Sequence, residues 1–139
     1  MKTLKIDNIE KADFSVLAIN SHIKSYTLCW QINNKLKTYF VKVENHSPQN
    51  NTNQTFERFT YKDIKNESQY DIISNLSSEG YLLNTHKSVN YFLKIQNKLW
   101  TGEKDIFINK LNEIPEILLI FELNLVKINS LTPFILDDK

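Results

Sequence analysis

Glycine and cysteine are scarce in this chain of 139 residues, which contains two glycines and one cysteine. The glycines, Gly80 and Gly102, stand alone, so the sequence has no glycine-rich loop of the kind that cradles phosphate groups. The single cysteine, Cys29, excludes an intrachain disulfide and any zinc site made of several cysteines. Composition alone therefore excludes three common features.

Arginine is also scarce, because only one of the 17 basic residues, Arg58, is an arginine. The arginine guanidinium is the usual group for bidentate capture of phosphate or carboxylate. The formal net charge of +1 adds no strong field that would attract nucleic acid or anionic lipid to the whole surface. The composition does not favour a dedicated polyanion binder.

Long hydrophobic runs are missing as well. The longest purely apolar run covers residues 117–121, far shorter than a membrane span. Residues 1–14 alternate charged and apolar side chains and lack the apolar stretch of a secretory signal. We therefore predict a cytoplasmic protein with no membrane contact, in which Cys29 is a reduced thiol.

The length and the hydrophobic content of 41% fit a single α+β domain over residues 1–139. Hydrophobic periodicity predicts helices over residues 22–36 and 103–112. It predicts strands over residues 14–19, 39–44, 55–63, 69–76, 80–83, 89–96 and 116–122. Residues 70–76 also fit a helix, so strand and helix remain open there. Residues 45–55 are predicted to be a flexible loop, and residues 124–139 a covering segment or a tail.

Two strand-helix-strand units follow from this order, one before residue 45 and one after residue 88. They predict a mixed, mostly antiparallel sheet with the helices packed on one face. Residues 80–83 and 89–96 are expected to form a hairpin. The segment 117–121 is apolar on both faces, so its strand is expected in the interior of the sheet rather than at its edge.

Several short motifs occur in an order that is found in a known group of proteins. They are Tyr26-Thr27-Leu28-Cys29-Trp30, Tyr70-Asp71-Ile72-Ile73-Ser74-Asn75, Gly80-Tyr81-Leu82-Leu83, Tyr91-Phe92-Leu93-Lys94-Ile95 and Ile114-Pro115-Glu116. Over residues 14–122 the chain resembles the bacterial IPExxxVDY family, although Ile120, Phe121 and Glu122 stand where the family has Val-Asp-Tyr. The resemblance implies an uncharacterised bacterial protein and brings no assigned reaction, cofactor or functional residue.

Residues with catalytic chemistry do not form a recognisable motif. His22, His46 and His86 lie in three separate segments, so we predict no metal site and no cofactor. Cys29 lies between Leu28 and Trp30, where a thiol acts as a small hydrophobic side chain. The sequence favours a non-catalytic protein with no catalytic residues. An enzyme would need a deep pocket that gathers His, Asp or Glu side chains from separate strands.

The most informative feature is the sheet face turned away from the helices. Alternation predicts that Tyr39, Val41, Val43, Tyr91, Leu93 and Ile95 lie beneath the helices. The opposite face then carries a candidate binding set of aromatic and basic residues, namely Phe40, Lys42, Arg58, Phe92 and Lys94, with Lys62 beside it. Aromatic and basic side chains on an open sheet can hold single-stranded RNA.

The same face is expected to carry much hydrocarbon, which is rarely left exposed to water in a stable monomer. Two kinds of cover remain open: the C-terminal segment with Leu125, Ile128, Leu131, Phe134 and Ile135, or a second copy in a homodimer. We therefore predict a non-catalytic protein-association module that self-associates through its sheet face. The alternative is a weak RNA or anionic-ligand binder that uses the candidate binding set.

Overall fold

A computed structural model describes residues 13–48, 54–128 and 130–136. Its helices are α2 (Ser25–Leu36) and α3 (Trp100–Asn112), and its 3-10 turns are η1 (Asn84–His86), η2 (Leu125–Lys127) and η3 (Thr132–Phe134). Its strands are β1 (Ser15–Asn20), β2 (Val41–His46), β3 (Phe56–Asp63), β4 (Ser68–Ser74), β5 (Leu76–Ser77), β6 (Gly80–Tyr81), β7 (Tyr91–Gln96) and β8 (Leu119–Glu122). Residues 49–53 of the predicted flexible loop and residues 129 and 137–139 of the predicted covering segment lie outside the described residues.

Six strands form one sheet in the order β2-β3-β4-β7-β1-β8, and β5 and β6 form a separate hairpin. Every pair of neighbouring strands is antiparallel. Strand direction therefore alternates along the sheet, and the two strands of each strand-helix-strand unit point the same way without being neighbours. The predicted α+β class with helices on one face is confirmed, and residues 70–74 belong to a strand.

One predicted pairing and one predicted strand position are wrong. Gly80–Tyr81 pairs with β5, while β7 lies between β4 and β1, so residues 80–83 and 89–96 do not form a hairpin. Asn75 accounts for the absence of this hairpin, because its buried side chain binds three backbone groups of the loop between β6 and β7. Its amide nitrogen donates to the carbonyl oxygens of His86 and Val89, both at 2.8 Å, and its oxygen accepts from the N–H of Leu83 at 2.9 Å. The second wrong prediction concerns β8, which is an edge strand and not an interior one.

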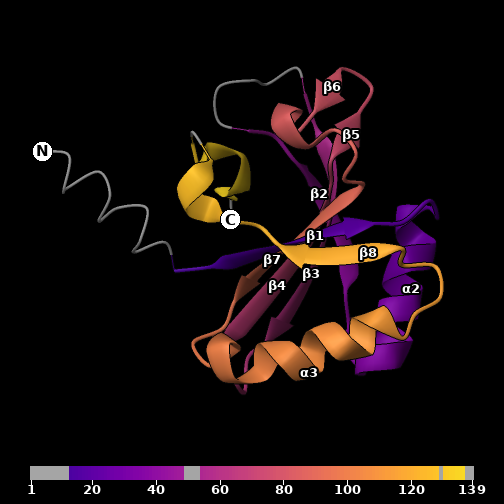
Figure 1. The fold of residues 1–139 in the computed structure, drawn as a ribbon, viewed down its shortest axis with the longest axis vertical. Coiled ribbons are helices and arrows are strands. Elements are labelled where there is room, and N and C mark those ends of the chain that lie inside the picture. The colour runs from indigo at the N-terminus through magenta and orange to yellow at the C-terminus, as the bar shows by residue number, and fades with distance from the viewer. Residues whose placement is uncertain (1–12, 49–53, 129, 137–139) are drawn as a thin grey trace, which may run out of the picture.

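The two helices lie against one face of the sheet and contact each other (Figure 1). They bury a large apolar cluster: Leu17, Ile19, Leu28, Cys29, Ile32, Phe40, Phe59, Tyr70, Ile72, Tyr91, Leu93, Ile95, Trp100, Leu111, Ile114 and Ile117. Apolar residues at a helical spacing form the buried side of α2, while Tyr26 and Trp30 are mostly exposed. Burial of this cluster is the main force that holds the helices on the sheet.

The opposite face carries a second apolar cluster. Its buried members are Val16, Ala18, Phe56, Ile73, Leu82, Leu83, Val89, Phe92, Leu123 and Phe134. The chain after β8 folds back across this face, and the rings of Phe92 and Phe134 meet edge to face with centroids 5.2 Å apart (Figure 1). Phe134 is fully buried. The C-terminal segment of the same chain therefore supplies the cover over this part of the sheet.

Candidate functional site

The candidate binding set does not form one exposed surface. Phe40 was expected to point away from the helices, but it is buried in the helix-side cluster, with its ring 5.8 Å from that of Tyr61. The cause is the end of α2, where Lys37 adopts a left-handed conformation and the Asn33 side chain binds the backbone of Phe40. The Asn33 oxygen accepts from the Phe40 N–H at 2.8 Å, and the Asn33 nitrogen donates to the Phe40 carbonyl at 3.1 Å.

This arrangement inverts the faces of β2 relative to the prediction. Lys42 pairs with Phe59, a residue of the helix-side cluster, so Lys42 also belongs to the helix side of the sheet. Its ammonium group donates to the Val43 carbonyl at 2.5 Å and to the Asn45 side chain at 2.7 Å. Tyr39 and Val41, which were expected beneath the helices, are mostly exposed. Phe40 and Lys42 are therefore separated from the rest of the set.

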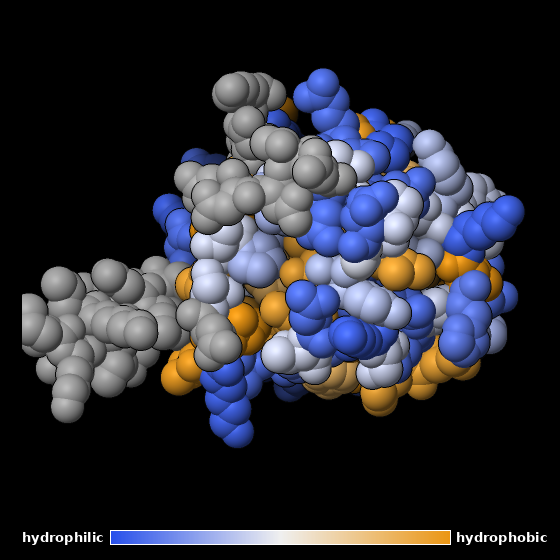
Figure 2. Space-filling view, turned by 90° about the horizontal axis from the view of Figure 1, so that it is seen from above, coloured by the Kyte–Doolittle hydropathy of each residue, from blue (hydrophilic) through white to orange (hydrophobic). Residues whose placement is uncertain are grey.

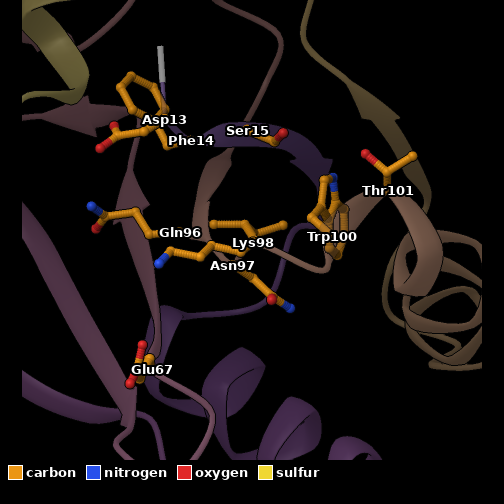
Figure 3. A pocket seen from close by; sticks show the side chains of 10 residues that line it. Asp13, Phe14, Ser15, Glu67, Gln96, Asn97, Lys98, Trp100 and Thr101 are labelled. Carbon is orange, nitrogen blue, oxygen red and sulfur yellow. The ribbon is translucent and has the colours of Figure 1, made fainter. Parts of the chain in front are cut away.

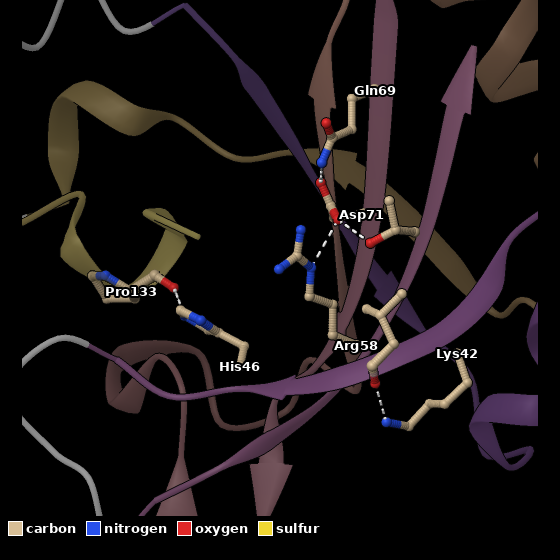
Figure 4. Close-up of polar contacts among 8 residues, drawn as sticks. Lys42, His46, Arg58, Gln69, Asp71 and Pro133 are labelled. Atoms are coloured by element: carbon tan, nitrogen blue, oxygen red, sulfur yellow. Dashed lines mark hydrogen bonds and ion pairs between the residues drawn. The ribbon is translucent and has the colours of Figure 1, made fainter. Parts of the chain in front are cut away.

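Arg58, Phe92 and Lys94 do lie on the face opposite the helices, as alternation predicts, and all three are buried. Arg58 forms a buried ion pair with Asp71, with Nε 2.9 Å from Oδ1 (Figure 4). Asp71 also accepts from the hydroxyl of Thr60 at 2.5 Å and from the amide of Gln69 at 3.1 Å. The ammonium group of Lys94 lies 4.6 Å above the ring of Phe14.

This polar cluster, defined here as Arg58, Thr60, Gln69, Asp71 and Lys94, connects three neighbouring strands. Asp71 has no exposed surface, so its charge requires the hydrogen bonds that surround it. The groups that Asp71 binds are a guanidinium, a hydroxyl and an amide, none of which is an activated nucleophile. The arrangement stabilises the middle of the sheet and offers no evident chemistry.

His46 holds the covering segment to the sheet beside this cluster. Its Nε2 atom lies 2.8 Å from the carbonyl oxygen of Pro133, and the side chain is buried (Figure 4). Burial lowers the pKa of His46, the hydrogen bond to Pro133 opposes that shift, and Arg58 and Lys94 lower it further. Since a carbonyl can only accept, Nε2 is the donor in this contact.

The one cysteine shows no sign of activation. Cys29 is buried on α2, and burial, with a smaller effect of Glu57, raises its pKa to about 12. The thiol is therefore protonated at neutral pH, whereas the nucleophilic form is the thiolate. Within residues 13–48, 54–128 and 130–136, no three His, Cys, Asp or Glu side chains are grouped so as to hold a metal ion. Helices long and apolar enough to cross a membrane are also absent from that part of the chain.

Two of the surface hollows are bordered by aromatic side chains. One, of about 370 Å³, lies where β1 and β7 meet the start of α3 and includes Trp100, Lys98 and the carboxylates of Asp13 and Glu67. Figure 3 shows Asp13 and Glu67 at opposite ends of it, so they do not form an acid-base pair. The other, of about 280 Å³, borders the stacked rings of Tyr61, Tyr70 and Phe107, whose neighbouring centroids are 5.7 Å apart.

The outer edge of β8 is the feature that sequence analysis missed. Leu118 is 59% exposed, Leu119 50% and Phe121 37%, although the segment was expected inside the sheet. Leu118 and Leu119 are adjacent in the chain and Phe121 follows two positions later. Figure 2 shows surface hydrophobic residues broken up by hydrophilic ones on the side seen from above. One signal in the sequence, Pro115, limits the strand on its N-terminal side, and β8 has only four residues. Short strands are common at sheet edges.

Among the described residues, one side of the β8 backbone has no paired strand. Leu123 donates its N–H to the Val16 carbonyl, and antiparallel residues alternate between inward and outward hydrogen bonding. Leu119, Phe121 and Leu123 therefore direct their backbone groups toward β1, while Ile120 and Glu122 direct theirs away from the sheet. In the described part of the chain, β1 is the only strand paired with β8.

The other edge of the sheet is protected. β2 carries Lys42 and Glu44, and its register with β3 shifts between Val43 and His46, which indicates a bulge. Charged side chains and bulges are devices that prevent a further strand from pairing. β8 has neither within the described residues, apart from Glu122, whose carboxylate is engaged by Lys104 at 3.1 Å and by the indole of Trp100 at 3.4 Å.

In comparisons with known proteins, no family model and no curated protein matches the chain.

Proposed function

We propose that this chain is a cytoplasmic, non-catalytic protein-association module that binds an extended protein segment along the outer edge of β8. The observation that carries the proposal is the combination of outward backbone groups at Ile120 and Glu122 with the exposed side chains of Leu118, Leu119 and Phe121. Strand addition to an exposed edge uses main-chain hydrogen bonds for affinity and alternate side chains for specificity. The proposal keeps the association function expected from the sequence and moves it from the sheet face to the sheet edge.

The alternative of RNA or anionic-ligand binding has less support. Stacking on a base requires an accessible aromatic face. Phe40 is buried beneath the helices and Phe92 beneath Phe134. Arg58, the lone arginine, is paired with Asp71. Membership of the IPExxxVDY family likewise remains a prediction, and it would add a bacterial origin without changing the proposed function.

The test places a lysine on each edge of the sheet. Leu119→Lys adds a charge on the exposed side of β8, and Val41→Lys is the matched control on β2, where Val41 is 55% exposed. A charged edge residue disfavours a further strand. Binding of extended peptides is measured on an immobilised array of random heptapeptides with the full chain. We expect Leu119→Lys to lose the peptides that the wild type and Val41→Lys retain.

Both variants should keep the wild-type circular dichroism spectrum, because both sites are about half exposed and lie in paired strands. The proposal fails if the wild type binds no extended peptide and does not self-associate. It also fails if the two lysine variants lose binding equally, since the binding would then not depend on β8.

A further inference from the structure

We infer that the segment that occupies the β8 edge is β8 of a second copy of this chain, paired antiparallel about a two-fold axis that passes beside Phe121. This inference rests on the proposed function and names its partner. The outward backbone groups belong to Ile120 and Glu122, the two residues on either side of Phe121. A two-fold axis at Phe121 places Ile120 opposite the second copy's Glu122, and each residue then exchanges both main-chain hydrogen bonds.

The side chains on this axis are self-complementary. Phe121 faces its own symmetry mate in a non-hydrogen-bonded pair, where cross-strand side chains approach most closely. Leu119 and Leu123 lie on the same face as Phe121, because residues two apart share a face of a strand. The register therefore sets Leu119 opposite the second copy's Leu123. Phe121 of each copy then covers its symmetry mate, and Leu119 lies beside Leu123, which its own chain already buries.

Charge does not oppose the pairing. Glu122 is the one charged residue of β8, and its carboxylate is already bound by Lys104 and Trp100 of its own chain. In the proposed register Glu122 lies opposite Ile120, and the two Glu122 residues are diagonal neighbours about 7–8 Å apart. Lys104 of each chain pairs with its own Glu122 carboxylate, which offsets the repulsion between them. The formal net charge of +1 adds little repulsion between copies.

A single register makes the inference testable by cross-linking. Cysteines in a non-hydrogen-bonded antiparallel pair lie about 4.5 Å apart at Cα, within the range for a disulfide. Phe121→Cys should therefore form an intermolecular disulfide under mild oxidation by oxidised glutathione. Leu119→Cys is the matched control, because its symmetry mate lies about 14 Å further along the partner strand, at about 3.4 Å per residue. Native Cys29 is 3% exposed and should form no intermolecular disulfide under these conditions.

We expect Phe121→Cys to cross-link at least roughly tenfold faster than Leu119→Cys, because pairing raises the local concentration of one thiol at the other. Wild-type chain should sediment as a monomer-dimer equilibrium that Leu119→Lys shifts to monomer. Equal cross-linking of the two cysteine variants would overturn the inference, even if dimers form, since the register would then be wrong.

Dimerisation and peptide binding can fail separately. A wild-type chain that stays monomeric at every concentration, while Leu119→Lys still abolishes peptide binding on the array, removes the second copy as the partner and leaves edge pairing intact. A wild-type chain that stays monomeric and binds no peptide overturns both the proposed function and the inference of a second copy. A dimer that persists in Leu119→Lys places the dimer interface elsewhere and overturns the inference, while the peptide array still decides whether the β8 edge binds an extended segment.

Discussion

At the scale of single residues, the buried carboxylate of Asp71 needs hydrogen bonds and an ion pair to compensate for its loss of contact with water. It has no exposed surface and is satisfied by a guanidinium, a hydroxyl and an amide from β3 and β4. A buried ion pair adds little net stability compared with well-packed apolar residues. Removal of one partner is far more costly, because it leaves the other charge buried without compensation.

We predict that Arg58→Met lowers the free energy of unfolding by about 3–5 kcal/mol, because the Asp71 carboxylate then loses the guanidinium that pairs with it. The measurement is urea denaturation followed by circular dichroism. The control is Lys62→Met, since Lys62 lies on the same face of β3 and is exposed. A change at such a surface site should alter stability by only about 0.5 kcal/mol or less. Similar losses in the two variants would show that the ion pair is not what Asp71 requires.

At the scale of elements, the C-terminal segment gives the sheet its second layer. Phe134 is its anchor, buried edge to face against Phe92. Phe134→Ala should destabilise the chain by about 3–5 kcal/mol, as deletion of a buried aromatic side chain does. It should also increase binding of a hydrophobic dye, because Phe92 becomes exposed.

The control is Ile135→Ala, at a neighbouring residue that is 52% exposed. This substitution should cost less than about 1 kcal/mol, because the side chain is only half buried. Denaturation and dye fluorescence are measured on both variants. A Phe134→Ala protein that is as stable as the control would mean that the segment does not hold the sheet face closed.

His46 couples the same segment to pH. Burial lowers the pKa of His46 in the folded chain, so the folded state resists a proton that the unfolded chain accepts below about pH 6.5. The free energy of unfolding should therefore fall as the pH falls from about 7.5 to about 5.5. His46→Gln should reduce this fall, and His22→Gln, at an exposed histidine, should not.

The groups that face His46 determine how far its pKa shifts. Arg58 and Lys94 disfavour the protonated form, while Asp71 and the Pro133 carbonyl favour it. Denaturation at a series of pH values is the measurement. If His46→Gln retains the full pH dependence, the burial of His46 is not the source of it.

The sequence predicted the individual helices and strands more accurately than it predicted which strands lie next to each other in the sheet. The strand 91–96 and its two faces follow from strict alternation, and they are confirmed by the burial of Tyr91, Leu93 and Ile95 on the helix side. The faces of β2 could not be predicted, because Asn33 at the end of α2 fixes the backbone of Phe40 through tertiary hydrogen bonds. The edge position of β8 was missed because burial of an apolar run depends on which strands flank it, and pattern alone does not specify the flanks.

The candidate binding set shows that alternation predicts the face of a residue but not its exposure. Alternation placed Arg58, Phe92 and Lys94 on the correct face, yet their accessibility depends on a segment that follows much later in the chain. The C-terminal segment with Phe134 was one of the two covers that the sequence left open, but no local pattern predicts that Phe134 lies against Phe92. Exposure, which decides whether a residue can bind a partner, is a property of the tertiary structure.

At the scale of the whole molecule, association links stability to concentration. If two copies pair through β8, unfolding must also separate them, so mass action stabilises the folded chain. Each tenfold rise in protein concentration should then add up to about 0.7 kcal/mol per chain while dimers dominate. The midpoint of thermal unfolding should rise with concentration in the wild type and in Val41→Lys, and stay constant in Leu119→Lys. A midpoint that is independent of concentration in the wild type would contradict dimeric stabilisation.

The unequal ends of the sheet have one more consequence. Addition of strands to both ends would let copies stack without limit into a fibril, whereas the bulge between Val43 and His46 blunts the β2 end. Once two β8 strands have joined, both outermost strands of the combined array are β2, and growth terminates. A chain whose β2 were straightened and stripped of its charges would lose that stop and polymerise.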